Sequence, residues 1–260
     1  MIAKYLKFWW LMSRNSFLAV LAQRLSFAIF LVGKVLRFLF FLGFLFFLLK
    51  GTNTLAGYGI NQVIFFFLTF NFIDATAQFF FREVYRFRPL VVSGDLDLVL
   101  VKPISGLFRV LLGGADLIDF VTLPPLAFAL FYVGRLLNPT TFEVGLFLLL
   151  VINGLLIATA FHIFVLSLGI ITLEIDHTVM IYRDLTSLGR FPVDIYKQPL
   201  RGVLTYLLPV GVMVTLPAKA LMGLVTPPGV LASFALSAIV IFLSLRFWNF
   251  ALTKYTSASS

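Results

Sequence analysis

The sequence predicts an all-α integral membrane protein, a bundle of about six transmembrane helices. Of its 260 residues 61% are hydrophobic and only 12% are charged, and the mean hydropathy is +1.05. An ordinary soluble domain has far more charge on its surface. Several apolar runs reach the roughly 20 residues that an α-helix needs to cross about 30 Å of hydrocarbon. Runs such as 38–49 are apolar on every face, whereas the strands of a β-barrel alternate apolar and polar residues.

The charged residues indicate topology and not a soluble partner such as nucleic acid. The chain has 20 Lys and Arg against 11 Asp and Glu, and the basic residues cluster at the ends of apolar runs. A nucleic-acid site would need a cationic face built outside the bilayer, so we expect no nucleic-acid partner. The absence of cysteine excludes disulfides, thiolate metal sites and cysteine nucleophiles. The first long apolar run lies too deep for a secretory signal peptide.

Residues 1–25 are expected to form an amphipathic helix in the headgroup layer. Four basic residues and no acid occur there, among two tryptophans and several apolar residues. Tryptophan rings favour the interface, and Lys and Arg bind anionic phosphates. The alternative is a plain N-terminal extension of the first span. The basic residues are Lys4, Lys7, Arg14 and Arg24.

The first span is expected at about 27–49 and carries two cations in its N-terminal half. Lys34 and Arg37 are three residues apart, so they share a helix face. They either snorkel toward the inner headgroups or pack against a partner, or they line a polar interior through which an anionic group passes.

The second span, about 60–80, contains a polar stripe. Asn71, Asp74 and Gln78 recur at i, i+3 and i+7 and must face protein or water instead of lipid. Pairing of Asp74 with Lys34 or Arg37 is one hypothesis, and a role in transport is the other. These five residues form the candidate translocation path.

The polar interval 82–114 follows the second span and is predicted to be cytoplasmic. It holds five basic residues against three acids, which places it inside by the positive-inside rule. With both termini inside as well, eleven Lys and Arg lie in inside segments and six in outside loops.

Two further spans are expected at about 117–137 and 144–173. Asp116 and Asp119 complement the dipole of the first of these helices, and Pro124 and Pro125 are expected to kink or shorten it. The second stretch is about 45 Å long as a helix, so it must tilt, kink near Gly154 or project into the cytoplasm. His162 within it is expected to be a hydrogen-bonded packing residue, with a proton relay as the alternative.

The region 174–225 allows two topologies. Either 174–190 crosses the membrane and 191–225 dips back as a re-entrant hairpin, or 174–200 is a cytoplasmic loop and 203–225 crosses. A last span is expected at about 229–250. Both topologies keep the two termini on the same side.

The common motifs of soluble enzymes are missing. The sequence has no Gly-rich phosphate loop, HExxH motif or GxSxG elbow, and its two histidines are 15 residues apart. The closest candidate cluster, Glu174, Asp176 and His177, is a weak signal for metal or proton chemistry. We therefore expect no catalytic, cofactor or metal site.

Three blocks resemble a bacterial family of type-2 ABC exporter permeases, six-span subunits without an ATPase domain. In that family a Gly-x-Leu-Asp-x-x-Leu-x-Arg/Lys-Pro segment follows the second span. It is matched here by Gly94, Leu96, Asp97, Leu100, Lys102 and Pro103, with Asp95 after the glycine. A second block is matched by Phe191, Pro192, Ile195 and Tyr196, and a third by Pro209, Pro217 and Ala218.

The resemblance implies that 82–114 presents a short coupling helix to a separate ABC ATPase subunit, which binds ATP and Mg. It also implies a homodimer or a heterodimer with a related permease in the bacterial inner membrane, and it favours 191–225 as an exterior re-entrant region. The residue types fit, because Gly94 can end a helix in the left-handed conformation and Pro103 limits the next one.

Alternatives from other classes remain at this point. The 82–114 loop could lie on the inner headgroups instead of docking a protein. The chain could be an ion-coupled transporter or channel, although we see no internal repeat of the kind such proteins show, or a membrane enzyme that acts on lipid.

Overall fold

The chain folds as an all-α bundle, which confirms the predicted fold class. The computed structural model describes residues 2–173 and 175–256, and their regular elements are all helices. Five helices there are long and apolar enough to cross a membrane, and a sixth span is counted if one bent pair of short helices is included. The five are α2 (Arg24–Thr52), α3 (Ile60–Phe81), α7 (Leu117–Leu136), α8 (Thr141–Thr172) and α12 (Pro227–Lys254).

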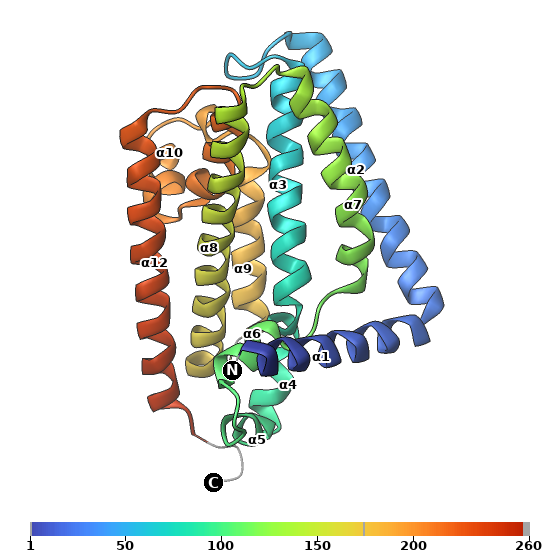
Figure 1. Cartoon of the computed structure of the whole chain (residues 1–260), viewed down its shortest axis with the longest axis vertical. Coiled ribbons are helices and arrows are strands. Elements are labelled where there is room, and N and C mark those ends of the chain that lie inside the picture. The colour runs from blue at the N-terminus through green and yellow to red at the C-terminus, as the bar shows by residue number, and fades with distance from the viewer. Residues whose placement is uncertain (1, 174, 257–260) are drawn as a thin grey trace.

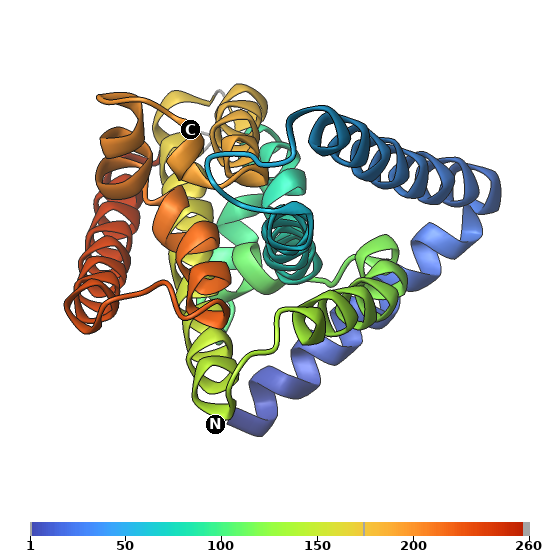
Figure 2. The same cartoon turned by 90° about the horizontal axis from the view of Figure 1, so that it is seen from above.

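The long helices stand side by side, and the first four alternate in direction (Figure 1). α2 rises from the lower end, α3 descends, α7 rises, and α8 and α12 both descend. The beginning of the chain and the end of α12 therefore lie at the same lower end. Seen from above, α2 lies at the outside, flanked by α3 and α7 (Figure 2).

The N-terminal helix α1 (Ile2–Ala22) is separate from α2 and lies across the lower end of the bundle (Figure 1). It is not an extension of the first span, because the chain turns at Gln23, whose φ of −101° and ψ of 59° are not helical. The hydroxyl of Ser13 accepts a hydrogen bond from the backbone N–H of Ala115 at 3.1 Å. α1 is thus fastened to the bundle by its inner face.

The polar interval after α3 folds into short helices at the lower end of the molecule. They turn back beneath α3 before α7 begins, and α5 lies farthest from the bundle (Figure 1). They are η1 (Arg82–Arg86), α4 (Phe87–Val92), α5 (Asp95–Leu100) and α6 (Gly106–Leu112).

The region that the sequence left open begins with α9 (Ile175–Ser187), which rises beside α8 from the lower end. At 13 residues α9 is about 20 Å long, less than the thickness of the hydrocarbon. A one-turn helix, η2 (Leu188–Arg190), extends it.

Residues 191–225 stay in the upper part of the bundle, and the chain enters and leaves this segment at the upper end (Figure 1). The segments Leu200–Leu207 and Gly211–Leu221 meet at an angle of 75°. A pair of short helices bent in this way is either a broken span or a re-entrant segment. Its elements are η3 (Val193–Ile195), α10 (Leu200–Gly202), η4 (Val203–Leu207), η5 (Gly211–Thr215) and α11 (Leu216–Leu221).

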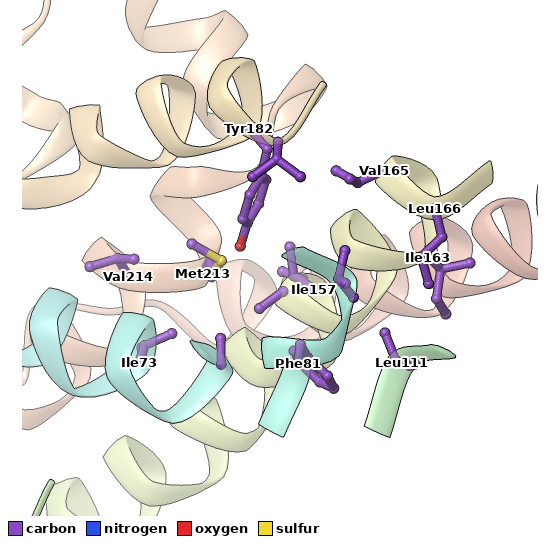
Figure 3. Packing of buried hydrophobic residues seen from close by; sticks show 14 of the residues in the cluster. Ile73, Phe81, Leu111, Ile157, Ile163, Val165, Leu166, Tyr182, Met213 and Val214 are labelled. Atoms are coloured by element: carbon purple, nitrogen blue, oxygen red, sulfur yellow. The ribbon is translucent and has the colours of Figure 1, made fainter. Parts of the chain in front are cut away.

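Packing of this bent segment against α8 explains why residue 154 is a glycine. α8 runs without interruption through Gly154, and a Cβ there would lie 2.3 Å from the carbonyl oxygen of Met213. The glycine allows close approach of two backbones. Figure 3 shows the surrounding cluster, in which Tyr182 reaches from α9 toward Met213. α7 likewise continues through Pro124 and Pro125 for 20 residues, so these prolines do not end it.

Candidate functional site

A cavity of about 230 Å³ lies between α2, α3, α7, α9 and η2. Its lining combines apolar and aromatic side chains with charged and polar ones. The apolar and aromatic residues are Val35, Phe38, Phe41, Phe67, Phe70, Ala75, Pro125, Leu126 and Ala129. The charged and polar residues are Lys34, Arg37, Asn71, Asp74, Thr122, Arg183, Thr186, Ser187 and Arg190.

Four of the five residues expected on a translocation path line this cavity. Lys34 and Arg37 face it from α2, and Asn71 and Asp74 face it from α3. Gln78 does not line the cavity. It is buried one helical turn further along α3 and donates a 2.6 Å hydrogen bond to Oδ2 of Asp74. The polar stripe of the second span therefore faces protein, as its spacing predicts, and Gln78 orients the carboxylate.

The hypothesis that Lys34 pairs with Asp74 is wrong, because Lys34 pairs with another carboxylate. Lys34 forms its ion pair with Asp119, whose side chain is almost fully buried in the first turn of α7. This happens because α7 starts beside α2, with Asp116 as its N-cap accepting hydrogen bonds from the N–H groups of Ile118 and Asp119. The sequence separation of 85 residues gives no local signal for this pair.

Two cavity residues, Arg183 and Arg190, were not among the predicted path residues. They are seven residues apart, with Thr186 and Ser187 between them, and this spacing places all four on one helix face. The same i, i+3, i+7 pattern that marked α3 was therefore present in α9.

The two arginines lie against aromatic rings instead of carboxylates. The guanidinium carbon of Arg183 is 5.9 Å from the ring centre of Tyr85, and that of Arg190 is 5.8 Å from Phe41 and 5.9 Å from Phe70. Such contacts attract a cation but leave its hydrogen-bond donors free.

The segment of residues 82–114, here called the coupling segment, places the family motif at the tip of the molecule. Gly94 has φ 79° and ψ 0°, the left-handed conformation expected for it, and α5 begins at Asp95. The hydroxyl of Ser93 donates a 2.7 Å hydrogen bond to the Asp95 carboxylate. Leu96 is fully buried, so it packs in the core and cannot contact a partner.

The outer face of α5 is apolar and exposed. Leu98 is 60% exposed and Val101 is 80% exposed. Leu100, Lys102 and Pro103 are also exposed, whereas Asp97 is half-buried. The surface that this segment offers to another molecule therefore centres on Leu98 and Val101, with a single lysine beside them.

Ion pairs join the coupling segment to the long helices. Arg109 Nη1 lies 2.6 Å from Glu83 Oε1 within the segment. Arg82 Nε lies 3.0 Å from Oδ2 of Asp116, the N-cap of α7. A displacement of the segment would therefore move the beginning of α7.

α1 also holds the coupling segment. Lys4 Nζ donates a 2.7 Å hydrogen bond to the carbonyl oxygen of Pro103, and the N–H of Ser105 donates to the Tyr5 hydroxyl at 3.3 Å. The Tyr5 ring meets the ring of Phe108 edge-on, with centres 4.7 Å apart.

At the upper end, Asp194 is the centre of a polar cluster that ties residues 191–225 to the loop before α3. It accepts hydrogen bonds from Lys219 Nζ at 2.6 Å and Tyr58 Oη at 2.9 Å, and it pairs with Arg201. Burial alone would raise the pKa of Asp194, but Lys219, Tyr58 and Arg201 outweigh it and hold this pKa below its usual range. The same burial and hydrogen bond raise the pKa of Tyr58.

The residues of 191–225 that match the family blocks are buried or hydrogen-bonded within this segment. Pro192 is buried next to η3, Pro209 is buried at the bend, and Pro217 is buried at the start of α11. The Tyr196 hydroxyl donates a 2.9 Å hydrogen bond to the carbonyl oxygen of Leu188.

Among residues 2–173 and 175–256, no group of His, Asp and Glu side chains is arranged to hold a metal ion. His162 is buried, with Nδ1 2.7 Å from the carbonyl oxygen of Ala158, among the rings of Phe81 and Tyr182. It is a packing residue, as expected. In the weak cluster Glu174, Asp176 and His177, Glu174 lies outside the described residues, while Asp176 Oδ2 lies 3.5 Å from Arg88 Nε.

Comparison with protein families adds one match. The profile of the ABC-2 family transporter proteins matches residues 34–259, which include α3, the coupling segment, the cavity and residues 191–225. Comparisons with curated proteins and with solved structures return no significant match. Because the profile covers far more than half of the chain, this multi-pass membrane protein belongs to the ABC-2 family of transporter proteins.

Proposed function

We propose that the chain is the permease subunit of an ATP-driven exporter in the bacterial cytoplasmic membrane, with both ends of the chain cytoplasmic. Two such subunits, identical or related, would assemble with two ABC ATPase subunits that bind ATP and Mg. The single observation that carries this proposal is the exposed apolar face of α5, because Leu98 and Val101 lie at the tip of a polar segment and not in the apolar bundle. A protein groove would cover them.

A chain of contacts supports transmission from α5 to the cavity. Arg82 in the coupling segment pairs with Asp116, the N-cap of α7. One turn further, Asp119 pairs with Lys34 of α2, which lines the cavity. Closure of the ATPases would push α5, and α7 and α2 would shift together. The cavity would then change between inward and outward access.

α2 supports an assembly of two permeases. It carries exposed aromatic and aliphatic side chains along its length and contacts the bundle only on one side. In a dimer this helix would face the second permease, and the cavity behind it would border the interface. Residues 191–225, placed at the exterior end, would cap this path.

Co-purification tests the proposal. The tagged full chain is expressed with the candidate ATPase subunits of its own host, and the captured ATPase is measured together with vanadate-sensitive ATP hydrolysis. Replacing Leu98 and Val101 with glutamate should reduce captured ATPase at least about tenfold, since it places two charges in the apolar contact. Leu224→Glu, which changes another exposed leucine at the opposite end of the molecule, is the control and should change nothing.

Two results would contradict the proposal. One is that the protein never captures an ATPase and that vanadate does not inhibit its transport. The other is loss of capture in the Leu224→Glu control to the same extent as in the double glutamate variant.

A further inference from the structure

The cavity contains more positive charge than the protein neutralises. Lys34 is paired with Asp119, which leaves Arg37, Arg183 and Arg190 against the single carboxylate of Asp74. Within residues 2–173 and 175–256, no carboxylate lies within 4.0 Å of a guanidinium nitrogen of these three arginines. Asp74 is in turn hydrogen-bonded by Gln78.

Arg190 is repelled by both other arginines and attracted by a single carboxylate. The charges of Arg37 and Arg183 act on it in one direction and that of Asp74 in the other. Placing several like charges at membrane depth is costly unless a counter-charge joins them. The lysines and arginines of the loops avoid this cost in water, but these three arginines face a cavity between helices.

Aromatic and apolar side chains line the cavity beside the arginines, and Arg190 lies directly over Phe41 and Phe70. Phe38, Phe41 and Phe67 stack together, with ring centres 5.3 Å apart for Phe38 and Phe67 and 4.7 Å apart for Phe41 and Phe67. Leu126 and Ala129 of α7 continue this surface. A ligand that fits this lining has an anionic group for the arginines and hydrocarbon for the rings and aliphatic side chains beside them.

We propose that this cavity binds the headgroup of an anionic amphiphile, a lipid-like molecule with a phosphate or carboxylate group. Arg37, Arg183 and Arg190 would bind the anion, and guanidinium groups suit both oxyanions because they donate paired hydrogen bonds. The tail would lie along the phenylalanines between α2 and α7. At about 230 Å³ the cavity is smaller than sites that enclose a whole drug-sized ligand, which fits a headgroup whose tail extends outside.

This inference rests on the proposed function, since it names the class of substrate for the exporter. Its test needs neither ATP nor an ATPase. The purified full chain is placed in nanodiscs of phosphatidylcholine, and binding of fluorescent single-chain probes is measured against empty discs. The probes share one acyl chain and differ in the headgroup: lysophosphatidic acid, a free fatty acid and lysophosphatidylcholine.

Lysophosphatidic acid and the fatty acid should bind saturably. Lysophosphatidylcholine should bind at least about tenfold more weakly, because its choline cation offsets the single charge of its phosphate and is repelled by the arginines. Equal binding of all three probes, or no saturable binding above empty discs, would overturn the proposal. Millimolar inorganic phosphate should fail to displace the anionic probes. Displacement by phosphate would show that the hydrocarbon tail contributes nothing to binding, and it would assign the site to a free anion.

Variants locate the site. Arg183→Gln with Arg190→Gln should weaken lysophosphatidic acid at least about tenfold while leaving the lysophosphatidylcholine background unchanged. Arg135→Gln with Arg246→Gln is the matched control, because these arginines also lie over phenylalanine rings, at 5.8 Å and 5.2 Å, but outside the cavity.

Equal weakening in both double variants would overturn the placement of the site. If the first pair fails to fold, the probe series on the unmodified protein still decides. A protein that captures its ATPase but binds neither anionic probe overturns this inference alone and leaves the exporter function intact.

Discussion

α2 and α3 are neighbours in the sequence and both are long apolar helices, yet they take opposite places in the bundle. In the most apolar 18-residue stretch of each span, 6% of the residues are buried for α2 and 61% for the span that α3 begins. α3 packs against α7, α8 and the bent segment, whereas α2 touches α3 and α7 on one side only. Hydropathy alone does not separate a helix that faces lipid or a second subunit from one that forms the core.

The difference shows where charge is tolerated. A peripheral helix can carry Lys34 and Arg37 at membrane depth only if they face inward, and both face the cavity. The central helix α3 carries neutral polar groups and one carboxylate toward the same space. α2 is therefore attached to the core by an apolar cluster around Leu45, Leu49 and Phe67 and by the ion pair of Lys34 with Asp119.

The largest effect is expected from removing the ion pair that attaches α2 to α7. Asp119→Leu would leave the Lys34 ammonium without its partner in a poorly hydrated site and should cost about 3 kcal/mol. The measurement is thermal unfolding of the purified protein in detergent, followed by tryptophan fluorescence.

The double variant Lys34→Met with Asp119→Leu should recover most of that loss, because neither charge then remains buried. Lys50→Met, at the exposed end of α2, is the control and should be neutral. An Asp119→Leu protein as stable as the double variant would show that α2 does not depend on this pair.

A second prediction concerns the core side of the comparison, where α8 meets the bent segment. Gly154→Ala would place a Cβ 2.3 Å from the Met213 carbonyl oxygen and should lower the free energy of unfolding by about 2 kcal/mol. Gly145→Ala lies on the same helix with nothing within 4 Å of the new Cβ, and should be neutral or up to about 1 kcal/mol stabilising. Thermal unfolding of the two variants side by side makes the comparison, and equal midpoints would contradict it.

The sequence predicted well what depends on local pattern. Apolar length located the cores of α2, α3, α8 and α12, and the left-handed conformation at Gly94 followed from its place between two short helices. The stripe of Asn71, Asp74 and Gln78 was expected to face protein or water, and it faces the cavity and the core.

It did not predict what depends on tertiary contact. Lys34 pairs with Asp119 and not Asp74, because the start of α7 comes to lie beside α2. α9 stays helical despite its charged residues, since Arg183 and Arg190 face a cavity and not lipid. Gly154 suggested a kink, although its reason is the backbone of a segment about sixty residues away.

The smallest effect is expected at the upper end, where the Asp194 carboxylate joins the bent segment to Tyr58 in the loop that follows α2. Asp194→Asn should cost about 1 kcal/mol at neutral pH, because the site is partly open to solvent and the charges are screened. Folding lowers the pKa of Asp194, so its stabilisation is fully present above the ordinary carboxyl pKa of about 3.9 and is lost as the pH falls through the lower folded value. The difference in unfolding midpoint between the unmodified protein and Asp194→Asn should therefore stay constant from about pH 8 to 5 and shrink toward pH 3. The control is Asp184→Asn, which removes an exposed carboxylate of α9 and should show no such difference in midpoint at any pH. If the midpoint difference for Asp194→Asn instead grows on acidification, the Asp194 carboxylate does not stabilise this contact.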